Sequence, residues 1–236
     1  MRGVDFQAVD MHADMRGFLR GRGEGDRPLE RRGGLEGSPQ LLELSGIGDP
    51  KVLAALETAI DADGNEVGGV PVVLLKGTAF VAAGLSAGQG RSIGDLDILV
   101  PREALDAVEA ALIAAGWEWV KPDPYDDAYY RRWMHELPPL IHAERDRMID
   151  VHHTILPLTA RIAPDAGALI ADSVALENGL RILNPNDMLC HAAAHLLADG
   201  DLAGGLRNLW DIHCLIQEFG VEGLEARARH HGLWRA

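Results

Sequence analysis

The sequence predicts an α+β chain in which strands and helices alternate first and a mostly helical region follows. Two short apolar runs, "VPVVLL" at 70–75 and "DLDILV" at 95–100, have the length and composition of buried strands. Each is followed by a segment whose apolar residues recur at helical spacing. From about residue 157 onward the pattern is helical, so the sheet is expected in the first two thirds of the chain.

Three regions are predicted along the chain. Residues 1–40 contain an arm rich in glycine and arginine that can bury little apolar surface. Residues 41–156 form the mixed α/β core, and residues 157–236 form the helical C-terminal region. We interpret the arm as a solvated linker because acidic residues are interspersed among the arginines; RNA binding by the arm is the less favoured alternative.

The elements of the core follow one another in a regular order. The sequence predicts a helix over 49–62, a strand over 70–75, a helix over 76–88, a strand over 95–100, a helix over 102–116 and a strand over 117–121. Asp49 is an N-cap candidate and Pro50 stands in the first turn of the first helix. Pro101 closes the second strand, and Gly116 ends the helix that follows it.

The segment 136–155 reads as two strand-like runs around a charged turn, "AERDR" at 143–147. Two prolines in the first run are typical of an edge strand or an irregular one. Beyond it, the strongest helical patterns cover 184–200 and 202–220. The predicted order is therefore a mixed core followed by helices, without an internal repeat.

Composition excludes several classes of protein. The formal net charge of −14 disfavours broad binding to nucleic acid, since phosphates would be repelled unless basic groups cluster locally. The two cysteines, Cys190 and Cys214, lie in apolar helical segments and are expected to be buried free thiols. No apolar run approaches the length of a membrane span, and the N-terminus lacks the apolar core of a secretion signal. We therefore expect a cytoplasmic protein.

Two aspartates interrupt the apolar run at 95–100. Asp95 and Asp97 are alternate residues, so a strand presents both carboxylates on one face, about 6.5–7 Å apart. A lone pair of this kind is more often the wet face of a half-buried strand. Asp150 changes that balance, because it also lies inside an apolar strand-like run and could meet the pair from a neighbouring strand. Three convergent carboxylates suit Mg²⁺, a hard cation that takes oxygen ligands.

The segment "LLKGTA" at 74–79 offers groups that could hold a phosphate. A strand ends at Leu75, and a helix begins with Lys76, Gly77 and Thr78. Lys76 offers a positive charge to a phosphate, Gly77 lets the phosphate come close to the backbone, and Thr78 offers a hydroxyl. The alternative is an ordinary turn with a solvated lysine. Neither this segment nor "GQGRSIG" at 88–94 is a nucleotide-binding fingerprint of the P-loop or dinucleotide type.

The loop before the two aspartates offers further contacts to an anion. Arg91 and Ser92 carry a charge and a hydroxyl, and Gly94 permits close approach. These residues stand directly before the strand that bears the acids. They are candidates for binding the same phosphates as the segment at 74–79.

Taken in order, the segments "LLKGTAFVAAG", "RSIGDLDILV", "LPPLIHAERDRMIDVHH", "HAAAHLLADG" and "LRNLWDIHCLI" resemble the uncharacterised nucleotidyltransferase family of the DNA polymerase β superfamily. The resemblance covers roughly positions 70–217. It implies a small mixed β-sheet flanked by helices, with a helical extension. It also implies Mg²⁺-dependent transfer of a nucleoside monophosphate from an NTP, for which ATP is the expected donor, to an acceptor hydroxyl.

The resemblance assigns roles to particular residues. By position, Asp95 and Asp97 match the family's paired metal-binding acids, and Asp150 matches the third carboxylate and is the expected base. The glycine–serine motif usual before the acids is replaced here by "KGT" at 76–78, and Arg91 and Ser92 are expected to compensate for it. Lys76, Gly77, Thr78, Arg91 and Ser92 are therefore the predicted nucleotide-binding residues, together with His152.

The histidines have structural and functional interpretations. His152 shares a strand face with Asp150 and could touch nucleotide or metal. His191 and His195 are four residues apart on a helix, and packing is favoured over metal binding because the glutamate base of a zinc protease is absent. Arg207 and Asp211, also four apart, are expected to pair with each other or with a neighbour.

Two other functions remain open alongside nucleotidyl transfer. One is a catalytically silent interaction module, antitoxin-like, that keeps the fold. The other is a metal-dependent glycosyltransferase, which would need a larger nucleotide-binding domain than the 95 or so residues before the aspartates can form. The acceptor is not readable from the sequence: a protein, a peptide, an RNA end and a small molecule all fit.

Overall fold

A computed structural model describes residues 69–91, 94–176, 179–198 and 205–235. All of these belong to one compact unit, residues 32–236. The predicted arm at 1–40, the predicted helix at 49–62 and Ser92 lie outside the described residues.

The described chain is built on one mixed sheet of seven strands in the order β3-β4-β5-β2-β1-β7-β6. The strands are β1 (Val73–Leu74), β2 (Asp95–Leu99), β3 (Trp117–Trp119), β4 (Leu140–His142), β5 (Met148–His152), β6 (Val174–Ala175) and β7 (Arg181–Ile182). Two neighbouring pairs are parallel, β2 with β5 and β1 with β7, and the others are antiparallel. The α+β class and the mixed sheet predicted from the sequence are confirmed.

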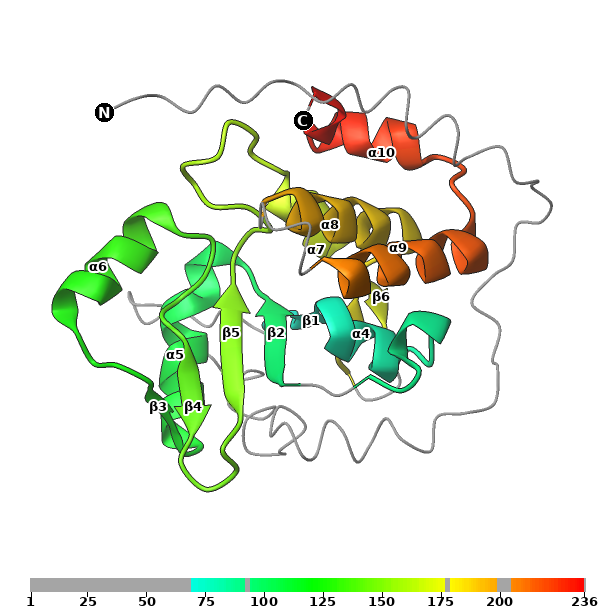
Figure 1. Ribbon diagram of the computed structural model, residues 1–236. Coiled ribbons are helices and arrows are strands. Elements are labelled where there is room, and N and C mark those ends of the chain that lie inside the picture. Colours follow the sequence, from blue (N-terminus) through cyan, green and yellow to red (C-terminus); the bar gives the residue numbers. More distant parts are fainter. Residues whose placement is uncertain (1–68, 92–93, 177–178, 199–204, 236) are drawn as a thin grey trace. The chain divides into compact units, whose positions relative to one another are not determined.

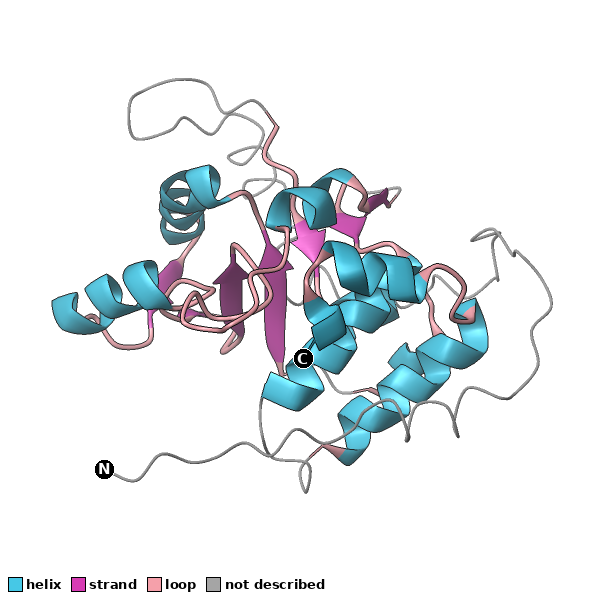
Figure 2. Cartoon of the chain, turned by 90° about the horizontal axis from the view of Figure 1, so that it is seen from above, coloured by secondary structure: helices cyan, strands magenta, loops and turns pink. Residues whose placement is uncertain are grey.

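Helices cover the sheet on both sides (Figure 2). They are α4 (Lys76–Ala82), α5 (Leu105–Ala114), α6 (Pro124–Trp133), α7 (Ala166–Ala171), α8 (Pro185–Ala198), α9 (Leu206–Phe219) and α10 (Leu224–His230), with short 3₁₀ turns at Ser86–Gly88, Arg102–Ala104 and Leu233–Arg235. Helix α8 packs against both α9 and α10, and α9 reaches the turn that follows α4 (Figure 1). No helix among the described residues is long and apolar enough to cross a membrane.

The core lies where the central strands meet their covering helices. Strands β1, β2 and β5 contribute side chains that are fully buried, and α5 contributes Val108 and Leu112 from its inner face. Cys190 and Cys214 are buried free thiols, as the sequence predicts. This apolar base makes the central strands a rigid support for the polar residues that they carry.

The structure differs from the sequence prediction in two places. Strands β6 and β7 lie in the region expected to be helical; each is two residues long, too short for a period-2 pattern to appear. Helix α6 was not predicted from the sequence, and none of its residues is buried. Its start is nevertheless well marked, since the Asp123 side chain accepts a hydrogen bond from the Tyr125 amide and Pro124 follows directly.

Candidate active site

The register of β2 and β5 brings distant acidic residues together. Asp97 lies directly opposite Asp150 in this parallel pair, and Asp95 lies opposite Met148. Residues paired across a ladder share a face, at a strand spacing of about 4.8 Å, and so do alternate residues of one strand. Asp95, Asp97 and Asp150 therefore project from the same side of the sheet, from an exposed position at 95 to a buried one at 97.

This arrangement changes the acidity of Asp150. Burial, the Asp97 carboxylate and the Glu136 carboxylate raise the pKa of Asp150 to about 6. A group with that pKa is largely ionised at neutral pH and binds a proton more readily than an ordinary aspartate. The increase shows that the acidic cluster lacks enough positive charge of its own.

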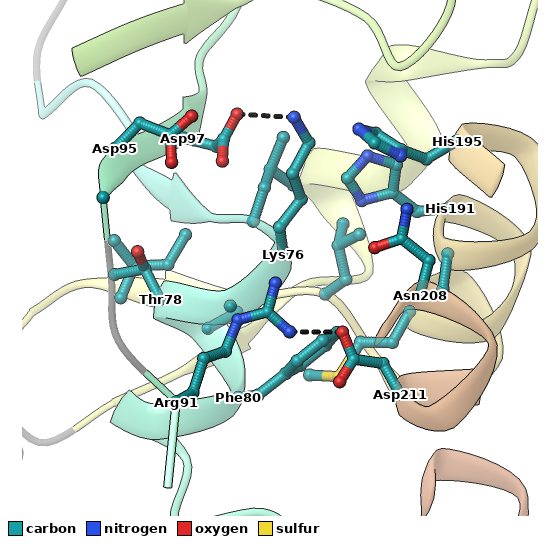
Figure 3. A pocket seen from close by; sticks show the side chains of 18 residues that line it. Lys76, Thr78, Phe80, Arg91, Asp95, Asp97, His191, His195, Asn208 and Asp211 are labelled. Atoms are coloured by element: carbon teal, nitrogen blue, oxygen red, sulfur yellow. Dashed lines mark hydrogen bonds and ion pairs between the residues drawn. The ribbon is translucent and has the colours of Figure 1, made fainter. Parts of the chain in front are cut away.

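Asp97 is held differently. Its Oδ1 accepts a hydrogen bond from Lys76 Nζ at 2.7 Å (Figure 3) and lies 3.0 Å from His152 Nε2. Burial favours the neutral acid, but the hydrogen bond to His152 and the charge of Lys76 outweigh it, so the pKa of Asp97 is well below its usual range. Asp97 is therefore an anchored carboxylate with both of these contacts on one oxygen.

Lys76 reaches Asp97 from an uncommon backbone conformation. Its φ is 48°, in the left-handed region that favours glycine, at the point where β1 gives way to α4. Burial opposes its charge, but Asp97 and then Asp150 favour it, so the pKa of Lys76 is raised. The predicted phosphate-binding lysine thus makes an ion pair with a predicted metal ligand.

Gly77 leaves room for Arg91. A Cβ at Gly77 would lie 2.2 Å from Arg91 Nε and 2.8 Å from its Cζ. Arg91 also lies over the Phe80 ring, with its Cζ 5.8 Å from the ring centroid, and forms an ion pair with Asp211 of α9. The absence of a side chain at 77 therefore lets Arg91 link the start of α4 to the C-terminal helices.

Asp211 is a junction of two arginines. Besides Arg91, it accepts a hydrogen bond from Arg207 Nε at 3.0 Å, which confirms the predicted pairing of 207 with 211. Arg207 also donates to the carbonyl of Ala87 at 2.6 Å. These contacts fix α9 against the loop that follows α4.

A pocket of about 220 Å³ opens between these elements. Figure 3 shows labelled polar side chains that line it, from α4, β2 and the loop between them on one side and from α8 and α9 on the other: Lys76, Thr78, Arg91, Asp95, Asp97, His191, His195, Asn208 and Asp211. The Oγ1 atom of Thr78 is buried and has no hydrogen-bond partner among the described residues. Asp150 is not part of the lining and stands beside Asp97 on β5.

Two histidines predicted to pack, His191 and His195, are pocket residues. Their rings meet edge to face with centroids 6.3 Å apart, and His191 is buried. Burial, followed by the charges of Lys76 and His152, keeps the pKa of His191 well below its usual value, so its imidazole is neutral. Both rings line the wall of the pocket, where the buried His191 contributes a neutral imidazole.

Sequence reasoning missed His135 and Glu136. Among the described residues, these two and His152 are a group whose ligand atoms all lie within 4.8 Å of one another; the three aspartates do not belong to it. Burial, with the nearby His152 and Lys76, lowers the pKa of His135 to about 3. Nothing in the spacing could have revealed the group, because 16 residues separate Glu136 from His152 and only the fold brings them together.

The donor set of the aspartates fits Mg²⁺. All three side chains offer carboxylate oxygens from rigid strands, and the raised pKa of Asp150 reflects a cluster that a divalent cation would stabilise. Lys76 is the cation that the structure places on Asp97. The site therefore places the acidic side chains next to the ammonium group of Lys76.

Comparison with known proteins gives one family and two solved structures. A family model described as "Uncharacterised nucleotidyltransferase" matches residues 65–236. The solution structure of the antibiotic-resistance factor ANT(2'')-Ia is similar at 15% identity, with a TM-score of 0.49, and the match covers 83% of this chain and 93% of that one. The crystal structure of ANT(2'')-Ia in complex with adenylyl-2''-tobramycin is similar at 15% identity, with a TM-score of 0.48, over 80% and 97%. No curated protein matches the chain.

Proposed function

Because the chain belongs to the uncharacterised nucleotidyltransferase family, we propose that it is an Mg²⁺-dependent enzyme that transfers a nucleoside monophosphate from an NTP, ATP being the expected donor, to a hydroxyl of an acceptor. The observation that carries this proposal is the register of Asp97 with Asp150, with Asp95 on the same face. Those three carboxylates would hold the metal, which when bound polarises the phosphates and stabilises the charge of the leaving group.

The reaction is an in-line displacement at the α-phosphorus. The acceptor oxygen forms a bond to this phosphorus while the bond to the bridging oxygen of pyrophosphate breaks, and pyrophosphate leaves with the electron pair. The hydroxyl proton passes to Asp150. Burial and the neighbouring carboxylates raise the pKa of Asp150 in the metal-free protein, and a bound metal would lower it again, so Asp150 would be ionised at neutral pH and able to accept that proton.

The residues at the start of α4 bind the phosphates. Lys76 bonds Asp97 here and lines the pocket, so its ammonium group can transfer from the carboxylate to a phosphate oxygen. The Thr78 hydroxyl, buried without a hydrogen-bond partner among the described residues, is a ready donor. Arg91 adds a second positive charge, and its ion pair with Asp211 keeps the guanidinium in place.

Two residues of the site act indirectly, through the groups next to them. Gly77 contributes to nucleotide binding indirectly. Its missing side chain leaves a space that the side chain of Arg91 occupies. His152 lies behind Asp97 and fixes the orientation of its carboxylate. We assign Ser92 to the same phosphates from its place in the sequence alone.

The test is transfer of label from each NTP. Purified full-length protein is incubated with each of the four α-³²P NTPs, with Mg²⁺ or with a chelator, in the presence of fractionated lysate that supplies protein, RNA and small-molecule acceptors. We expect Mg²⁺-dependent label in one acceptor fraction, with ATP as the preferred donor, and loss of that label in Asp97→Asn. Absence of label with every nucleotide would refute the enzyme and favour the catalytically silent module.

A further inference from the structure

A second side-chain cluster lies next to Asp97 and includes His152, which contacts the same Asp97 oxygen as Lys76 does. It consists of His135, Glu136 and His152, and it is held by backbone hydrogen bonds. Glu136 is directly opposite His152 in an antiparallel bridge. The Leu137 amide donates to the Val151 carbonyl at 2.9 Å, and the His153 amide donates to the His135 carbonyl at 2.8 Å. The three side chains are therefore positioned by rigid backbone.

The hydrogen bonds of His152 define its tautomer. Asp97 is an ionised acceptor bonded by Lys76, so the Nε2 atom of His152, 3.0 Å from the same oxygen, must carry the proton and donate it. The other ring nitrogen, Nδ1, faces Glu136. That atom is buried and has no hydrogen-bond partner among the described residues, although Glu136 Oε2 is only 3.4 Å away.

Burial raises the pKa of Glu136, and either a proton or a metal ion between His152 Nδ1 and Glu136 Oε2 would satisfy both atoms. Around a tetrahedral Zn²⁺ with bonds of about 2.0–2.1 Å, neighbouring ligand atoms are about 3.4 Å apart. The separation of His152 Nδ1 from Glu136 Oε2 is 3.4 Å, and that of His135 Nε2 from the same oxygen is 3.7 Å. Both are too long or too poorly aimed for hydrogen bonds and match the edges of a metal coordination polyhedron.

We propose that His135, Glu136 and His152 bind a first-row transition-metal ion such as Zn²⁺, separate from the Mg²⁺ on the aspartates. Two imidazoles and one carboxylate suit Zn²⁺ and its neighbours in the series, whereas Mg²⁺ prefers oxygen ligands alone. Three protein ligands leave at least one coordination position for water. The cluster is therefore a second metal site, next to the catalytic carboxylates.

The site makes His152 a positioning residue. A metal on Nδ1 keeps the proton on Nε2, and that proton is donated to Asp97. The orientation of Asp97 is thus tied to occupation of the second site. This consequence for catalysis rests on the proposed function, but binding of the metal itself does not.

Metal binding is measured without nucleotide. Chelator-treated full-length protein is titrated with Zn²⁺ against a chromophoric chelator, with excess Mg²⁺ present to occupy the aspartates. We expect one equivalent to bind to the wild type, and Glu136→Gln and His135→Gln each to weaken binding at least about tenfold. Asp95→Asn and the exposed Glu118→Gln on β3 should bind as the wild type does. No stoichiometric binding, or binding lost in Asp95→Asn but kept in Glu136→Gln, overturns the proposal.

Two further measurements complete the test, and the first of them uses no variant. X-ray absorption by the wild-type Zn²⁺ complex should show two imidazole ligands, and a site without imidazole contradicts the assignment. In the transfer assay, Glu136→Gln should lower kcat about tenfold with KM for the NTP unchanged, and an unchanged kcat removes the positioning role. If the protein binds Zn²⁺ in this way but transfers no label, the metal site is supported and the proposed function is refuted. If it transfers label but does not bind Zn²⁺, the proposed function is supported and the metal site is refuted.

Discussion

Asp97 and Asp150 lie directly opposite each other on the parallel strands β2 and β5, 53 positions apart in the chain. Asp97 is anchored by Lys76 and His152, whereas Asp150 has a pKa raised to about 6. The two carboxylates share one face of the sheet, yet their neighbours shift their pKa values in opposite directions, that of Asp97 down and that of Asp150 up. From this difference we propose that Asp97 serves as a fixed metal ligand and Asp150 as the proton acceptor.

Replacing either carboxylate should abolish transfer without unfolding the chain. We expect Asp97→Asn to lower kcat/KM by roughly 10³-fold, because the fixed metal ligand is lost, and Asp150→Asn to lower kcat by about 10²–10⁴-fold, because the base is lost. Glu118→Gln, exposed on β3, is the control and should keep full activity. Steady-state kinetics with labelled NTP measure the effect; activity within about threefold of wild type in both variants would exclude these roles.

The sequence predicts this centre because its signals are local. Asp95 and Asp97 alternate in an apolar run, Asp150 interrupts another, and short strands impose the shared face. The ion pair of Arg91 with Asp211 and the cluster of Glu136 with His152 could not be predicted, since each joins segments that only the tertiary fold brings together. Strands β6 and β7 could not be predicted for a different reason: each has only two residues, which is too few to show the alternation typical of a strand.

Lys76 combines a functional charge with a strained backbone, and two substitutions separate these effects. Both Lys76→Ala and Lys76→Gly remove the ammonium group from Asp97, so both should raise KM for the NTP at least about tenfold. Only alanine retains a Cβ at φ 48°, so the glycine variant should be the more stable by about 1 kcal/mol. Thermal unfolding and NTP titration measure the two; equal stabilities would show that the backbone there is unstrained.

Gly77 and Gly94 line the same pocket and predict opposite outcomes on substitution by alanine. A Cβ at Gly77 would displace Arg91, so Gly77→Ala should raise KM for the NTP about tenfold while the chain still folds, since the side chain of Arg91 can move. A Cβ at Gly94 meets nothing within 4 Å, so Gly94→Ala should bind NTP as the wild type does. Isothermal titration of both variants tests this, and equal affinities would show that Arg91 does not contact the nucleotide.

The raised pKa of Asp150 implies that the metal-free protein is less stable than it could be. A folded-state value near 6, against about 3.9 in the unfolded chain, means that ionised Asp150 destabilises the fold as pH rises through 6. In chelator, Asp150→Asn should therefore be more stable than wild type by about 1–2 kcal/mol at pH 8, with the difference shrinking by pH 5. Denaturant unfolding at the two pH values measures this. If the stability advantage of Asp150→Asn over wild type grew toward low pH, the pKa of Asp150 would not be raised in the folded protein.

The polar core of the C-terminal helices predicts the opposite dependence on pH. Asp187 is fully buried in α8, receives two hydrogen bonds from Arg227 of α10 and lies 2.9 Å from His231 Nε2. Burial favours the neutral acid, but Arg227 and His231 outweigh it and lower the pKa of Asp187. A lowered pKa stabilises the fold above the unfolded value, about 3.9, and this stability is lost as pH falls below it.

Asp187→Asn should therefore lower the free energy of unfolding by about 3–5 kcal/mol at pH 7, since it leaves Arg227 half-buried beside a neutral amide. The matched control is Asp172→Asn, because Asp172 pairs with the same arginine but is 54% exposed; it should cost less than about 1 kcal/mol. Denaturant unfolding at pH 7 and at pH 3.5 measures both variants. The difference in unfolding free energy between Asp187→Asn and wild type should narrow at pH 3.5, because Asp187 is then partly protonated in the unfolded wild-type chain but still ionised in the folded one. A gap that is the same at both pH values would show that packing, and not the charge of Asp187, joins α8 to α10.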